Sequence, residues 1–131
     1  QTSKLIENTI LRTIKFYNLR FQDCILLGFS QGGMMTFEFG NYIQKRLGAL
    51  VILSGRIISK NIIKNQFLLK TPIFISHGNK DQVLPLKLFN SSCEYLKNNR
   101  LLFEAHTLEG DGHTISPKAI NLLQKFIKKI L

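Results

Sequence analysis

The sequence predicts an α/β fold in which about four parallel strands form a sheet with helices on its flanks. Short apolar runs, of the length of buried strands, alternate with longer stretches in which apolar residues recur at helical spacing. A glycine-containing loop follows each apolar run, and prolines stand where two of the helices are expected to begin. The length suits one domain, so we expect residues 1–131 to form a single unit.

The first half of the chain predicts two helices and two strands. Helical spacing of apolar residues over Ser3–Tyr17 indicates an amphipathic helix lying on the sheet. After a turn, Cys24–Phe29 is a continuous apolar strand of the kind that is buried on both faces in a parallel sheet. A helix from Gln31 to about Arg46 follows, and Ala49–Leu53 is expected to be a second buried strand.

The second half continues the alternation after one ambiguous segment, Arg56–Lys70, for which a short helix and a loop are both open. Strands are expected at Ile73–Ser76 and Phe103–Leu108. Proline suits the first position of a helix, so the two remaining helices are expected to run from Pro85 to about Asn99 and from Pro117 to Leu131.

The charge balance is strongly basic, with 18 Lys and Arg against 8 Asp and Glu, a net charge of +10. The lysines are spread singly along helix faces, which is typical of a solvated surface. The Lys-rich end, 125–131, is too short and too apolar to be a nucleic-acid tail. We therefore expect no nucleic-acid partner, while a diffuse attraction to anionic lipid or acidic partners stays open.

The two cysteines, Cys24 and Cys93, fall on a buried strand and a helix, which favours free thiols and fits a reducing cytoplasm. No signal peptide opens the sequence, and no apolar run reaches the ~18 residues of a membrane-spanning helix. We expect a cytoplasmic protein without stable membrane insertion. There is no Cys/His cluster with metal-ligand spacing, so no metal site is expected.

The stretch Gly28-Phe29-Ser30-Gln31-Gly32 holds the first chemical signal. A serine hydroxyl is a poor nucleophile at neutral pH, so an enzyme that uses one must expose it and place a base beside it. A sharp turn between a strand and a helix, with small residues two positions before and after the serine, achieves the exposure. Such a pattern also arises by chance, but the apolar strand before it and the helix after it favour a nucleophile over an ordinary turn serine.

Two further loops at strand ends carry an acid and a base. Asp81 follows the third expected strand, and His113 lies just before the last helix. Because the carboxyl ends of parallel strands meet at one edge of a sheet, these side chains are expected to lie near Ser30. The chain order serine, aspartate, histidine is the order of α/β-hydrolases.

Other residues compete for these roles. Asp111 could be the acid, but a carboxylate two residues from His113 is more suited to capping a turn. His77 more plausibly supports the acid loop than acts as a base, and His106 falls inside a strand as a packed or surface residue. Ser54, at the end of the second strand, is a weaker candidate for a substrate contact.

Taken together, three motifs resemble the phospholipase/carboxylesterase family of α/β-hydrolases, which includes the acyl-protein thioesterases. They are Gly28-Phe29-Ser30-Gln31-Gly32-Gly33, His77-Gly78-x-x-Asp81-x-Val83-x-Pro85 and Gly110-x-Gly112-His113-x-Ile115. The resemblance implies a three-layer α/β-hydrolase fold and a serine hydrolase that cleaves carboxylic esters or acyl thioesters through an acyl-enzyme, without a cofactor. It also implies that Ser30, Asp81 and His113 are catalytic and that the N–H of Gln31 belongs to the oxyanion hole.

Members of this family begin with strands and a Leu-His-Gly-type loop that have no counterpart here, so the chain resembles the C-terminal part of the family domain, an incomplete fold. This implies an open edge at Cys24–Phe29 and the loss of a second oxyanion donor. A dimer or a complementing N-terminal chain is a possible partner. The alternatives are an inactive truncated hydrolase, a non-catalytic binding module, or another α/β-hydrolase chemistry such as a peptidase or dienelactone-type hydrolase.

Overall fold

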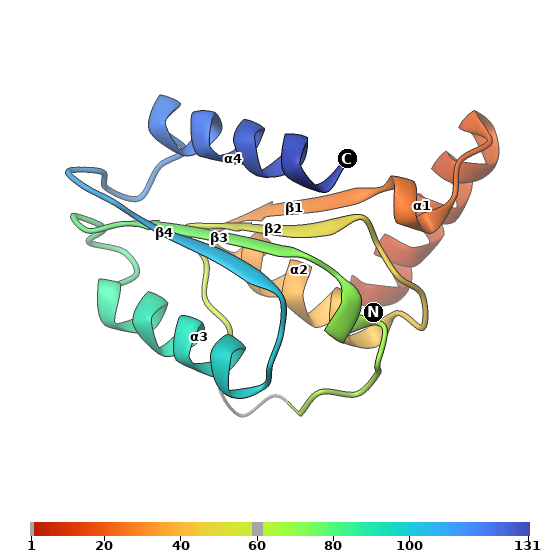
Figure 1. Ribbon diagram of the computed structural model, residues 1–131, viewed down its shortest axis with the longest axis horizontal. Helices are drawn as coiled ribbons and strands as arrows, with labels where there is room; N and C mark the ends of the chain where they lie inside the picture. The colour runs from red at the N-terminus through yellow and green to blue at the C-terminus, as the bar shows by residue number, and fades with distance from the viewer. Residues whose placement is uncertain (1, 59–61) are drawn as a thin grey trace.

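The computed structural model describes residues 2–58 and 62–131, in which four parallel strands form one sheet (Figure 1). Their spatial order follows the chain: β1 (Ile25–Phe29), β2 (Ala49–Leu53), β3 (Ile73–Gly78) and β4 (Phe103–Leu108). The predicted α/β class and the four strands are confirmed. β3 runs two residues further than predicted, so His77 belongs to the strand.

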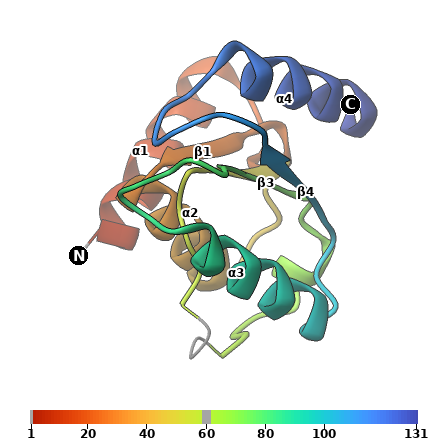
Figure 2. The same cartoon turned by 90° about the vertical axis from the view of Figure 1, so that its left-hand side faces the viewer.

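Helices cover both faces of the sheet, giving three layers (Figures 1 and 2). The helix α4 (Pro117–Ile130) lies on one face, and α2 (Gln31–Tyr42) and α3 (Leu86–Asn98) lie on the other. The remaining helix, α1 (Thr2–Tyr17), stands at the β1 side of the sheet. Short 3₁₀ turns are at Phe21–Asp23 and Leu68–Lys70. None of the described helices is long and apolar enough to cross a membrane.

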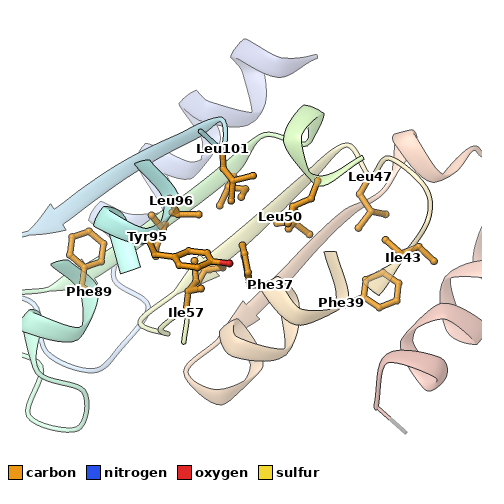
Figure 3. Packing of buried hydrophobic residues seen from close by; sticks show 14 of the residues in the cluster. Phe37, Phe39, Ile43, Leu47, Leu50, Ile57, Phe89, Tyr95, Leu96 and Leu101 are labelled. Atoms are coloured by element: carbon orange, nitrogen blue, oxygen red, sulfur yellow. The ribbon is translucent and has the colours of Figure 1, made fainter. Parts of the chain in front are cut away.

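Burial of β2 shows how the layers are joined. All five of its residues are buried, because the strand has a neighbour on each side and helices on each face. Leu50 and Ile52 join the larger apolar cluster beneath α2 and α3 (Figure 3), whereas Val51 and Leu53 pack under α4. Each such side chain contributes roughly 1.5–3 kcal/mol on burial. The two clusters hold the carboxyl ends of the strands in fixed relative positions.

In the described sheet β1 pairs with β2 alone, so its other side is an edge. Ile25 is 37% exposed and Leu27 46% exposed. The predicted burial of this strand on both faces is therefore wrong for these residues, while the open edge that the family resemblance implied is what the strand order shows. Apolar composition predicts a strand, but burial depends on what covers it.

Three helix predictions need correction. The predicted helix at the start does not lie on the sheet, because α1 packs against α2 and buries none of its residues fully. The helix α2 ends at Tyr42 and not near Arg46, because Ile43 is extended and its side chain enters the core. Pro85 caps α3 instead of beginning it.

The described parts of the ambiguous segment 56–70 contain no α-helix. Residues 59–61 lie outside the described chain. The side chain of Asn41 binds the backbone of this segment. Its Nδ2 donates to the carbonyl of Ile62 and its Oδ1 accepts from the N–H of Lys64, both at 2.7 Å. A loop anchored by a side-chain amide gives no periodic signal, which explains why the sequence left this segment open.

Candidate active site

Ser30 occupies the sharp turn between β1 and α2. Its backbone has φ 58° and ψ −121°, a combination that non-glycine residues rarely adopt. The N–H of Ser30 donates to the carbonyl of Leu53 in β2, and its carbonyl accepts from Gly33, each at 2.9 Å. Bonds from the neighbouring strand and from the helix therefore hold the serine in a strained conformation at the carboxyl end of the sheet.

The two glycines around the serine differ in what they permit. A Cβ on Gly28 would lie 2.0 Å from the carbonyl oxygen of Gly32 and 2.5 Å from the hydroxyl of Thr36. A Cβ on Gly32 would have no described atom within 4 Å apart from its chain neighbours and the backbone of its own helix. The predicted need for small residues on both sides of the serine therefore holds for Gly28 alone, because the strand and the first turn of α2 meet there.

Asp81 lies in the loop between β3 and α3, and its side chain is fully buried. Its Oδ1 accepts from the N–H groups of Val83 and Leu84, both at 2.8 Å. Burial by itself raises the pKa of this carboxyl, but the hydrogen bonds from Leu84, His113 and Val83 outweigh it, and the pKa of Asp81 lies below its ordinary value. The group is therefore a carboxylate at neutral pH.

His113 lies in the loop between β4 and α4 and joins the other two residues. Its Nδ1 is 2.7 Å from Oδ2 of Asp81, and its Nε2 is 2.9 Å from Oγ of Ser30. A carboxylate can only accept, so Nδ1 carries a proton and the Nε2 lone pair faces the serine hydroxyl. Residues from three separate loops, predicted from the sequence, meet in one hydrogen-bonded line.

The acid and base loops are also tied to each other through the backbone. The N–H of Lys80 donates to the carbonyl of Asp111 at 2.8 Å, and a Cβ on Gly78 would lie 2.2 Å from that carbonyl. The Asp111 carboxylate accepts from the hydroxyl of Ser116, which caps α4, and lies 3.6 Å from Lys118. Asp111 therefore organises its turn, and the hydrogen bond to the His113 ring comes from Asp81.

Gln31 is the first residue of α2. The first N–H groups of a helix have no partner within it, and the helix dipole makes them attractive to negative charge. The N–H of Gln31 directly follows the serine, so it can donate to an oxygen that becomes negative during attack by Oγ.

The remaining candidates lie outside this line of contacts. Nε2 of His106 lies 2.7 Å from a carboxylate oxygen of Glu104, two residues earlier on β4, and both side chains are partly exposed. Ser54 is only 3% exposed, and its hydroxyl faces the carbonyl of Thr114 at 3.5 Å. One neighbour was missed: Gly55, after β2, comes so close that a Cβ there would lie 2.8 Å from the Ser30 carbonyl. The Ser-Gly pair ending an apolar run was the available signal.

Among the described residues, no three His, Cys, Asp or Glu side chains gather in a way that could hold a metal ion. The groups that meet at the site are a serine hydroxyl, an imidazole and a carboxylate, with backbone N–H groups beside them. This set can activate a hydroxyl, transfer its proton and stabilise an oxyanion.

The model of the phospholipase/carboxylesterase family matches residues 1–131. The chain belongs to this family. Acyl-protein thioesterase 1 homolog 1 of Dictyostelium discoideum is 30% identical over 133 residues, covering 100% of this chain and 59% of the relative. Acyl-protein thioesterase 1 of Saccharomyces cerevisiae is 31% identical over 137 residues, covering 95% of this chain and 58% of the relative.

A solved family structure has the same fold as this chain. The crystal structure of SOBER1 from Arabidopsis thaliana superposes with a TM-score of 0.88 at 27% identity, covering 98% of this chain and 62% of SOBER1. These matches confirm the α/β-hydrolase resemblance. The chain spans about three fifths of the length of these relatives.

Proposed function

We propose that this chain carries the catalytic residues of a serine hydrolase that cleaves carboxylic esters or acyl thioesters. The observation that carries the proposal is the line of contacts from Ser30 Oγ through the His113 ring to the buried Asp81 carboxylate, at 2.9 and 2.7 Å. The family membership and the relatives named as thioesterases and as a carboxylesterase support the substrate class.

In the proposed reaction each residue has one step. Oγ of Ser30 attacks the acyl carbonyl carbon while its proton passes to Nε2 of His113, and Asp81 stabilises the resulting imidazolium. The N–H of Gln31 donates to the oxyanion of the tetrahedral intermediate. When the carbon–oxygen or carbon–sulfur bond breaks, the leaving alcohol or thiol takes the proton from His113. Water then attacks the acyl-serine by the same route and releases the acid.

Covalent labelling tests this proposal directly. A fluorophosphonate reacts with an activated serine, so we expect it to label the wild-type chain and to leave the Ser30→Ala variant unlabelled. Turnover of p-nitrophenyl acetate and butyrate follows the same pattern. Labelling that survives in Ser30→Ala, or its absence from a folded wild-type sample, contradicts the assignment. Labelling without turnover of simple acyl esters points instead to a peptidase or dienelactone-type reaction.

We propose further that full activity needs a polypeptide segment beside β1. The unpaired edge of β1, the exposed Ile25 and Leu27 side chains of this strand, and the three-fifths coverage of the relatives support this proposal. The family resemblance assigns a second oxyanion donor to that segment, and loss of one donor costs about 10²–10³ in rate. We therefore expect labelling of this chain alone to be slower by that order than labelling of a longer chain that includes the segment.

A second candidate is a non-catalytic fragment that keeps the motifs by descent. The same unpaired edge favours it, because an open apolar edge makes a chain prone to association. A folded sample that does not react with fluorophosphonate, either alone or in the longer chain, would support this candidate over the hydrolase. We also propose a cytoplasmic location, with which the free thiols of Cys24 and Cys93 are compatible.

A further inference from the structure

His77 is a buried titratable side chain that the proposed reaction does not use. It is 0% exposed, and its ring stacks on Phe89 of α3 with centroids 5.6 Å apart. Its Nδ1 is buried and has no hydrogen-bond partner. A buried nitrogen without a partner destabilises the fold relative to an apolar side chain of similar size. The polar contacts of His77 are those of its other ring nitrogen, Nε2.

The Nε2 atom of His77 faces the acid loop. It lies 2.7 Å from the carbonyl oxygen of Leu84, and because a carbonyl can only accept, Nε2 carries the proton. The same atom lies 3.3 Å from Oδ2 of Asp81, so the positive end of this N–H also faces the carboxylate. Oδ2 is the oxygen that accepts from Nδ1 of His113.

Leu84 connects His77 to the other carboxylate oxygen. Its carbonyl accepts from His77, and its N–H donates to Oδ1 of Asp81 at 2.8 Å. The backbone group that orients one oxygen of the acid is thus itself held in place by the histidine. Through the Leu84 bonds and through the contact with Oδ2, the position of His77 bears on both oxygens of Asp81.

We propose that His77 is a positioning residue of the active site: it fixes Leu84 and thereby the orientation of the Asp81 carboxylate toward His113. The inference rests on the proposed function, because the acid that it orients is the acid of that reaction. His77 touches neither Ser30 nor a reacting atom. Small errors in the placement of a catalytic group cost up to about a hundredfold in rate, which gives such a residue a measurable effect.

Two substitutions separate the N–H group from the packing of the ring. His77→Phe keeps an aromatic ring against Phe89 and removes the donor, whereas His77→Gln removes the ring and keeps a side-chain N–H. His106→Phe, on the adjacent strand and outside the triad contacts, is the matched control. The measurements are the rate constant of fluorophosphonate labelling, the unfolding temperature, and the proton resonance of the His113–Asp81 hydrogen bond.

We expect His77→Phe to slow labelling about tenfold to a hundredfold and to shift or broaden that resonance. His77→Gln should recover most of the rate, and His106→Phe should leave the rate and the resonance unchanged. Labelling of His77→Phe at the wild-type rate, or equal losses in His77→Phe and His77→Gln, would overturn the inference.

A measurement on the wild-type protein covers the case in which a variant does not fold. Nitrogen NMR of the imidazoles should find neutral His77 protonated on Nε2, and protonation on Nδ1 instead would overturn the inference without any substitution. The Ser30→Ala labelling control isolates the proposed function itself. If that control fails while His77 proves to be protonated on Nε2, the hydrolase assignment is wrong, and with it the positioning role given to His77.

Discussion

The neighbouring strands β1 and β2 are alike in sequence and unlike in their surroundings. Both have five residues without a polar side chain, ILLGF and ALVIL. Every residue of β2 is buried, whereas Ile25 and Leu27 of β1 are 37% and 46% exposed. The difference arises because α4 packs against β3 and β4 and leaves the same face of β1 uncovered, and because β1 has a neighbouring strand on one side alone in the described sheet. Apolar composition indicates that a strand suits a buried position, but the strands and helices around it decide whether it is buried.

The residues of the candidate site follow both edge and interior strands. Ser30 follows the edge strand, while Asp81 and His113 follow the interior strand β3 and its neighbour β4. The acid and base loops are bound to each other, and the serine turn is fixed by a bond to β2 and by its own helix. The acid and base loops, which we call the interior side after β3, are therefore held by contacts with each other even though β4 is also an edge strand, whereas the nucleophile follows a strand whose outer side is unpaired.

The largest expected effect lies on the interior side. Asp81→Asn removes the charge that stabilises the imidazolium and favours the wrong tautomer of His113, so labelling and ester turnover should fall by about 10⁴-fold. Asp111→Asn, which alters a carboxylate bound to Ser116, should cost far less. The rate constants of fluorophosphonate labelling measure both. Comparable losses in the two variants would mean that His113 does not depend on Asp81 in solution.

The two strands themselves should respond differently to truncation. Ile52→Ala in β2 removes a fully buried side chain and should lower the free energy of unfolding by about 2–5 kcal/mol. Leu27→Ala in β1 removes a half-exposed one and should cost less than about 1 kcal/mol. Urea denaturation of the two variants gives both values. A large loss in Leu27→Ala would show that the outer side of β1 is covered in solution.

The elements and the site residues were largely predictable, because each rests on a local signal. Strand β2 was predicted with its observed ends because an unbroken aliphatic run between glycines reports burial. Ser30, Asp81 and His113 could be chosen because each follows a strand, and parallel strands end at one edge.

What the sequence did not give depends on contacts between distant residues. The exposure of Leu27 depends on where α4 packs on the sheet, and the loop near Ile62 follows from the amide of Asn41. The early end of α2 follows from Ile43 turning into the core. None of these features produces a periodic pattern of apolar residues in its own segment.

A finer comparison concerns the two glycines of the serine turn. Gly28→Ala places a methyl group against the backbone of Gly32 and should cost about 1–3 kcal/mol, with a strong loss of labelling as Ser30 moves. Gly32→Ala meets no described atom and replaces glycine in a helix, so it should be neutral or stabilise by up to about 1 kcal/mol. Thermal unfolding and labelling rates check both. A severe loss in Gly32→Ala would show that another segment packs against the start of α2.

The smallest expected effect is the dependence of stability on acid, which probes the interior side alone. Hydrogen bonds hold the pKa of Asp81 in the folded chain below its ordinary value, which is about 3.9 in an unfolded chain. As the pH falls below about 4, the unfolded state takes up a proton before the folded state does, so this stabilisation is present above that pH and is lost on further acidification.

The difference in free energy of unfolding between the wild type and Asp81→Asn should therefore shrink as the pH falls below about 4. Urea denaturation at a series of pH values measures it, and taking the difference removes the contributions of Asp23 and Glu104, whose pKa values are also lowered. A difference that stays constant to pH 3 would mean that the carboxylate is not held by Leu84 and His113 in solution. The interior side of the site would then be as incomplete as the edge.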